Sequence, residues 1–159
     1  MTGAVAVSIG ELGATDRDAV RALILDGLEE HWGQLEPGLN ADVDDLAGAY
    51  RDGTVLVARV AARIVGVGVV VPVHGDAVGE VKRMSVARDL RRSGIATALL
   101  QEMVAIGTRR GWRALVLETT ATWSDAVALY EHFGFAFMHF EDGEFGRDIH
   151  FRLDLTRTP

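Results

Sequence analysis

Apolar side chains recur every fourth position between residues 15 and 32, which predicts a helix capped by Thr15 or Asp16. A second helical stripe begins at Gly94 and ends at Gly111; its apolar positions are Ile95, Leu99, Met103 and Ile106. Two shorter segments also have helical character, an acidic one at 41–53 and one at 122–134. The glycines and proline of 31–40 separate the first two helices.

Runs rich in branched apolar residues predict seven strands, at 4–9, 54–60, 63–73, 79–86, 113–119, 135–140 and 148–155. Ala61 and Ala62 join the second and third of them as a tight antiparallel hairpin. The segment 113–119 is almost continuously apolar, so we expect it to be buried on both faces and paired in parallel. The turn-rich segment 141–147 should form the loop between the last two strands. The resulting order, β-α-α-β-β-β-α-β-α-β-β, predicts a single α/β domain over residues 1–159, with a mixed sheet flanked by helices.

Composition excludes several classes of protein. The chain has no cysteine, and its five histidines lack the close spacing of a metal motif, so no metal site is expected. A formal charge of −7 argues against nucleic-acid binding. No apolar window is long enough to span a membrane, and no signal peptide is evident, so we expect a cytoplasmic protein. The charge is uneven, however: residues 1–52 hold eleven acidic side chains, whereas residues 82–92 hold five basic ones and Asp89 alone.

The basic segment leads directly into a helix through the sequence RRSGIA, residues 91–96. The first N–H groups of a helix have no intrahelical partners, and the helix dipole adds partial positive charge there. Gly94 and Ala96 leave room for an anion to approach the backbone, and Arg91 and Arg92 add donors that suit phosphate oxygens. The pattern therefore favours a phosphate or diphosphate site. A simple helix start with solvated arginines is the alternative.

RRSGIA also resembles the Q/R-x-x-G-x-G/A signature of the GNAT acetyltransferase superfamily. The segment LVLETTATWSDAVALYEHFGF, residues 115–135, is similar to the next conserved block of that family, in the right order; its matching residues are Ala126, Leu129, Tyr130, Gly134 and Phe135. The resemblance covers residues 54–140. It implies a sheet with a splayed central strand pair, and transfer of acetyl from acetyl-CoA to an amine. Homodimers are frequent in this family, so a homodimer stays open.

The resemblance also implies which residues hold acetyl-CoA. The diphosphate would lie on the N–H groups of residues 92–97, with Arg91 adding charge; these cradle residues are Arg91, Arg92, Ser93, Gly94, Ile95, Ala96 and Thr97. The pantetheine arm would pair with the irregular strand end at Met84, Ser85 and Val86. Many members have an asparagine at the position of Trp123, and this asparagine contacts the pantetheine arm. Here Ser124 or a water would have to make that contact.

Two residues are candidates for proton transfer. An amine must lose a proton before it attacks a thioester, and Glu80 stands where some members of the family carry their general base. The alternative role for Glu80 is a salt bridge to Lys82 or Arg83. Glu118 is the second candidate for the base. Tyr130 resembles the family's general acid, which protonates the departing thiolate. The alternative role for Tyr130 is that of an aromatic residue in the core.

The acceptor is the least determined part. We expect a small cationic amine, with Trp32, Leu35 and Pro37 as an apolar wall and Glu29, Glu30 and Glu36 as attracting charges. Acetylation of a peptide N-terminus or a lysine is an alternative. A regulatory module that binds CoA without turnover is another.

Overall fold

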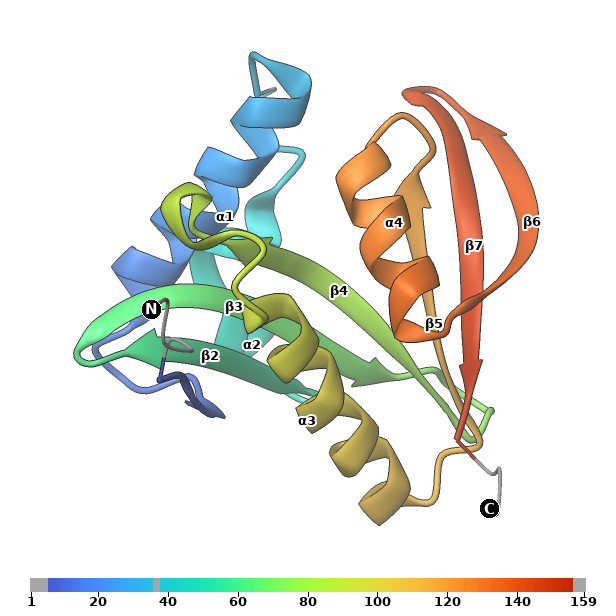
Figure 1. The fold of residues 1–159 in the computed structure, drawn as a ribbon, viewed down its shortest axis with the longest axis horizontal. Coiled ribbons are helices and arrows are strands. Elements are labelled where there is room, and N and C mark those ends of the chain that lie inside the picture. The colour runs from blue at the N-terminus through green and yellow to red at the C-terminus, as the bar shows by residue number, and fades with distance from the viewer. Residues whose placement is uncertain (1–5, 36–37, 156–159) are drawn as a thin grey trace. The chain divides into compact units, whose positions relative to one another are not determined.

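A computed structural model of the chain describes residues 6–35 and 38–155 (Figure 1). The strands are β1 (Ser8–Glu11), β2 (Thr54–Val60), β3 (Arg63–Pro72), β4 (Val78–Val86), β5 (Ala114–Thr120), β6 (Ala136–Gly143) and β7 (Gly146–Asp154). The α-helices are α1 (Arg17–Trp32), α2 (Leu46–Ala49), α3 (Ile95–Arg110) and α4 (Ser124–Phe133), with short 3-10 turns η1 (Ala41–Asp45) and η2 (Arg88–Leu90). The predicted element order is confirmed. No helix in the described ranges is both long and apolar enough to cross a membrane.

The seven strands form one mixed sheet with the order β1-β2-β3-β4-β5-β7-β6. β4 and β5 pair in parallel over only three residue pairs, from Val78–Ala114 to Glu80–Val116, as expected for a splayed central pair. The pairs β1–β2, β2–β3, β5–β7 and β6–β7 are antiparallel. Two compact units share the chain: unit 1 extends to Val71 and includes Lys82–Glu102, and unit 2 comprises Pro72–Val81 and the chain from Met103 onward.

Unit 1 is built on the predicted hairpin of β2 and β3. Val57 of β2 and Val67 of β3 face each other in register, and both are almost fully buried. Val20 and Ile24 lie four positions apart on α1, and both pack into the same core as these valines. The apolar face of α1 and the buried residues of β2 and β3 thus form one apolar cluster.

In unit 2, α4 packs on β7. Tyr130 of α4 lies among the rings of Phe135 and Phe151, with ring centroids 5.7 and 6.3 Å away. At the start of β4, a side-chain carbon on Gly79 would come within 2.3 Å of the Trp112 ring. Only glycine permits this close approach, so Gly79 is fixed by packing.

Three local predictions need correction. The loop within 141–147 is shorter than predicted, because β6 ends at Gly143 and β7 begins at Gly146, and an ion pair of Asp142 with Arg147 closes the hairpin. The first strand is shifted to Ser8–Glu11, and part of its predicted range lies outside the described residues. Asp16 stands at the N-cap of α1, but its carboxylate accepts from the Gly13 N–H and from Arg59 and makes no cap bond.

Candidate active site

The turn from β4 into α3 is open to solvent. Arg91 to Gly94 are all exposed, and Arg92 and Gly94 both have positive φ, 63° and 86°. The first helical bond after the turn runs from the Ala98 N–H to the Gly94 carbonyl, at 2.9 Å. The N–H groups of Ile95, Ala96 and Thr97 therefore precede the helical ladder, as an anion cradle requires.

The arginines of this turn do not all face solvent. Arg91 donates two hydrogen bonds to the Glu30 carboxylate, both at 2.6 Å, and Arg88 lies 3.3 Å from the carboxylates of Asp26 and Glu30. The bonds from Arg91 hold the pKa of Glu30 below its ordinary value. Arg92 is exposed, and no carboxylate in the described part of the chain lies within ion-pair distance of it. The excess positive charge of the turn is therefore carried by Arg92.

This pairing also changes the expectation for the acceptor region. Glu30, one of the three glutamates expected to attract a cationic acceptor, is neutralised by Arg91. Glu29 is exposed, and Trp32 at the end of α1 has 43% of its surface exposed. Glu36 and Pro37 lie outside the described residues.

The C-terminal part of β4 is irregular, as its sequence suggests. Arg83 has a φ of 55°, which a residue other than glycine rarely adopts and which interrupts the extended strand. Met84, Ser85 and Val86 follow it and are half-buried. A side-chain carbon on Gly27 would lie 3.4 Å from the Ser85 hydroxyl, so α1 packs closely on this part of the strand.

A hydrogen-bonded cluster that the sequence did not reveal holds the Arg83 side chain. Arg83 donates to both oxygens of Asp42, at 2.8 and 2.7 Å, and the Tyr50 hydroxyl donates to the same carboxylate at 2.6 Å. Burial raises the pKa of Asp42, but the bonds from Arg83 and Tyr50 outweigh it, and the net pKa is lowered. Burial and the bond to Asp42 raise the pKa of Tyr50 to about 12. The cluster thus stabilises the irregular segment of β4.

Replacing Asp42 by asparagine should lower the free energy of unfolding by about 2 kcal/mol, between the values for exposed and buried ion pairs. The side chains of Arg83 and Asp42 are 20% and 21% exposed, so solvent screens the pair only partly. The folded pKa of Asp42 lies below its unfolded value. The contribution is therefore present above that unfolded value and is lost as pH falls through the folded pKa.

Urea unfolding of the parent and Asp42→Asn at pH 7 and pH 3 measures both effects. Asp44→Asn is the matched control, because the Asp44 carboxylate pairs with Arg21 at an exposed site. It should change the free energy of unfolding by less than about 0.5 kcal/mol. Equal losses for the two variants at pH 7 would contradict the role given to the cluster.

The two candidate bases occupy different environments in unit 2. Glu80 is half-buried on β4 and pairs with Val116 across the short parallel ladder. Glu118 is exposed on β5, and its carboxylate lies 3.4 Å from Nε2 of His150. Glu118 thus faces His150 on the neighbouring strand β7.

Tyr130 and Ser124 come from α4. Tyr130 is only 7% exposed, and its ring packs in the apolar core of unit 2, as the structural alternative predicted. Burial raises its pKa above the ordinary value, and no hydrogen bond within the described part of the chain contributes to this shift. The phenol therefore stays protonated at neutral pH, which a general acid also requires. Ser124 is exposed at the first position of the helix, next to Trp123.

The chain is similar to known acetyltransferases both in sequence and in fold. The model of the acetyltransferase (GNAT) family matches residues 18–135. The chain is 35% identical over 131 residues to an IAA acetyltransferase from Azospirillum brasilense, which covers 82% of each chain. A GNAT-family acetyltransferase from Staphylococcus aureus Mu50 has the same fold, with a TM-score of 0.83 at 17% identity, covering 95% of this chain and all of the other. An aminoglycoside 6'-N-acetyltransferase complexed with coenzyme A gives a TM-score of 0.75 at 16% identity, covering 96% and 99%.

Proposed function

Because the chain belongs to the acetyltransferase (GNAT) family, we propose that it transfers the acetyl group of acetyl-CoA to a primary amine of a small molecule. The observation that carries this proposal is the exposed turn before α3. There the N–H groups of Ile95–Thr97 precede the helical ladder, and Arg92 supplies a positive charge. A diphosphate matches such a turn because it offers several acceptor oxygens and negative charge.

In this proposal the backbone from Arg92 to Thr97 binds the diphosphate of CoA. The pantetheine arm pairs with the main chain at Met84 and Val86, beside the half-buried Ser85. The left-handed φ of Arg83 supports this role, because a break in a strand leaves main-chain groups without ladder partners. Ser124 contacts the pantetheine arm in place of the asparagine that many family members have.

The proposed reaction is direct transfer, since the chain has no cysteine to carry a thiol-bound intermediate. Glu80 accepts a proton from the acceptor ammonium, and the free amine attacks the thioester carbon. The new C–N bond forms, and the nitrogen, positively charged once it is bonded to carbon, loses its second proton to solvent. The C–S bond breaks, and Tyr130 donates its phenolic proton to the departing thiolate. Solvent then restores the protonation states of Glu80 and Tyr130.

The acceptor proposed here is a small cationic amine. A net charge of −7, with eleven acidic residues in the first 52, favours cations over anions near the protein. A peptide N-terminus or a lysine side chain is also an amine, so the test must include both.

The experiment is release of the CoA thiol from acetyl-CoA in the presence of an amine panel. The panel contains polyamines, aminoglycosides, amino acids, simple amines without a second charged group, and peptides with a free N-terminus or lysine. Faster thiol release with small cationic amines is the expected result. Preference for peptides would replace the proposed acceptor, and binding of acetyl-CoA without thiol release from any amine would favour a regulatory CoA-binding module.

Changing Gly94 to glutamate should weaken acetyl-CoA binding at least tenfold, which corresponds to about 1.4 kcal/mol. The substitution places bulk and negative charge beside the proposed diphosphate site. No heavy atom lies within 4 Å of the position of a new side-chain carbon at Gly94, so the fold can accept the side chain. The positive φ adds backbone strain of about 1 kcal/mol to folding. Calorimetric titration with acetyl-CoA measures the affinity.

The matched control is Gly75→Glu, in the turn between β3 and β4. Gly75 also has a positive φ, 80°, and open space around it, so the strain and the added charge are the same. It should bind acetyl-CoA with parental affinity. If the two variants bind equally well, the diphosphate does not lie at Gly94.

A further inference from the structure

Four ionisable side chains form a row across the three C-terminal strands. In the strand register, Glu118 of β5 lies opposite His150 of β7, and His150 lies opposite His139 of β6. Directly opposed residues share one face of a sheet, so these three side chains project to the same side. Glu141 joins them from β6.

A β-bulge in β6 brings His139 to this face. Phe137 is opposite Phe151, whereas His139 is opposite His150, so Met138 is an extra residue in the strand. Without the bulge, Met138 would oppose His150 and His139 would point to the other face. Bulges commonly redirect a side chain toward a functional position.

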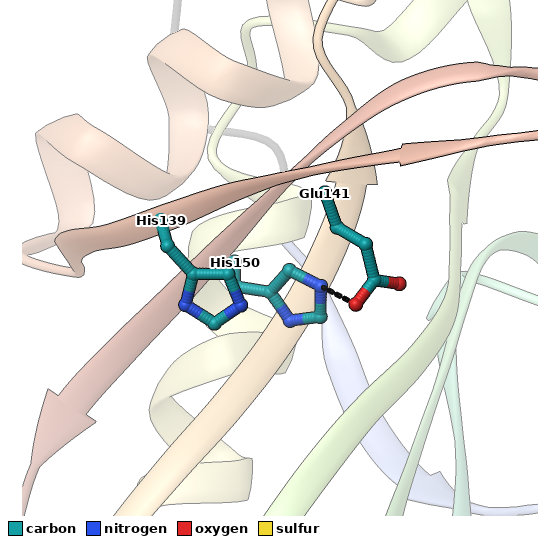
Figure 2. Close-up of side chains that lie close together, drawn as sticks. All are labelled: His139, Glu141 and His150. Carbon is teal, nitrogen blue, oxygen red and sulfur yellow. Dashed lines mark ion pairs between the residues drawn. The ribbon is translucent and has the colours of Figure 1, made fainter.

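The donor atoms of the cluster lie close together. Figure 2 shows the two imidazole rings side by side, and their centroids are 4.3 Å apart with an interplanar angle of 13°. Nε2 of His150 is 3.7 Å from a Glu141 oxygen and 3.4 Å from a Glu118 oxygen. One ligand atom from each of His139, Glu141 and His150 lies within 4.8 Å of the others. Donors around a tetrahedral Zn²⁺ with bonds of about 2.0–2.1 Å are about 3.4 Å apart. The two rings are stacked, so one imidazole must turn out of the stack for both nitrogens to point at one ion.

Nε2 of His150 is also an orphan polar atom. It is buried, and it makes no hydrogen bond within the described part of the chain, although the two carboxylates lie nearby. A buried polar atom without a hydrogen bond requires an explanation, and a bound ion is one of the common ones.

We propose that His139, Glu141 and His150 bind a divalent zinc ion, with Glu118 or a water as the fourth ligand. The mixed imidazole and carboxylate set suits Zn²⁺, whereas Ca²⁺ and Mg²⁺ prefer oxygen ligands alone. The ion joins β6 to β7 and so holds β6, the exposed terminal strand of the sheet, in place. The sequence predicted no metal site because the histidines are not closely spaced, but pairing of neighbouring strands brings two of them together.

The test is calorimetric titration of chelator-treated, desalted protein with zinc chloride. The parent should bind one Zn²⁺ per chain, and Zn²⁺ should raise its melting temperature. His139→Ala and Glu141→Gln alter exposed side chains, so both should fold, bind Zn²⁺ at least tenfold more weakly, and lose most of the thermal shift. His132→Ala is the matched control, because His132 is exposed on α4 outside the cluster, and it should behave as the parent.

X-ray absorption at the zinc edge of the loaded parent identifies the ligands independently. The proposal expects two imidazole nitrogens and carboxylate oxygen at about 2.0–2.2 Å. Absence of saturable binding would overturn the proposal. Parental affinity in both His139→Ala and Glu141→Gln would overturn it as well, because the ion would then bind elsewhere. Neither measurement depends on acetyl-CoA or on the proposed reaction.

Discussion

Replacing Glu80 by glutamine should lower kcat for acetyl transfer by about 10²-fold, the lower end of the range for a positioned acid or base. Glutamine keeps the shape of the side chain but cannot accept the acceptor's proton. The Km for acetyl-CoA should change little, because in the proposed function Glu80 does not bind CoA. The loss should become smaller at high pH, where a growing share of the amine is already neutral.

A pH profile of thiol release for the parent and Glu80→Gln measures this effect. Glu118→Gln is the control, since Glu118 is exposed and its carboxylate lies beside His150. It should keep parental kcat. A profile for Glu80→Gln that matches the parent's at every pH would remove Glu80 from the mechanism, and a loss in Glu118→Gln would make that residue the base.

Local patterns predicted most of the fold because its signals lie within single elements. The hairpin of β2 and β3, the stripe of α3 and the glycine that ends α4 were all visible in short windows of sequence. The main error was the length of the loop between β6 and β7. Asp142, Gly143 and Gly146 are typical loop residues, but pairing between the two strands continues through them to a tight turn. Tertiary pairing outweighed local propensity there.

The site was predictable only where its chemistry depends on backbone conformation. RRSGIA correctly indicated an open turn before a helix, and the structure adds that Gly94 has a positive φ there. The partners of the basic residues were not predictable, because they are distant in sequence: Glu30 is 61 residues from Arg91, and Asp42 is 41 residues from Arg83. Neither pairing has a local signal, so only the folded chain reveals that Arg91 is neutralised and that Arg83 is held by Asp42.

The two tyrosines of the chain allow the catalytic and structural roles of a phenol to be separated. Tyr50 donates a 2.6 Å hydrogen bond to Asp42, so Tyr50→Phe should lower the free energy of unfolding by about 1–2 kcal/mol and leave kcat near parental. Tyr130 has a buried ring, and no hydrogen bond to its hydroxyl is found among the described residues. Tyr130→Phe preserves the ring contacts with Phe135 and Phe151, so stability should change by less than about 0.5 kcal/mol.

Turnover should show the opposite pattern. If the Tyr130 phenol protonates the departing thiolate, Tyr130→Phe should lower kcat by about 10²-fold while acetyl-CoA affinity stays parental. The raised pKa of Tyr130 keeps its proton in place across the neutral range, so the loss should not depend on pH between 6 and 9. Steady-state thiol release and urea unfolding of both variants measure the two effects. Near-parental kcat in Tyr130→Phe would show that this residue serves the core alone and that another donor, or solvent, protonates CoA.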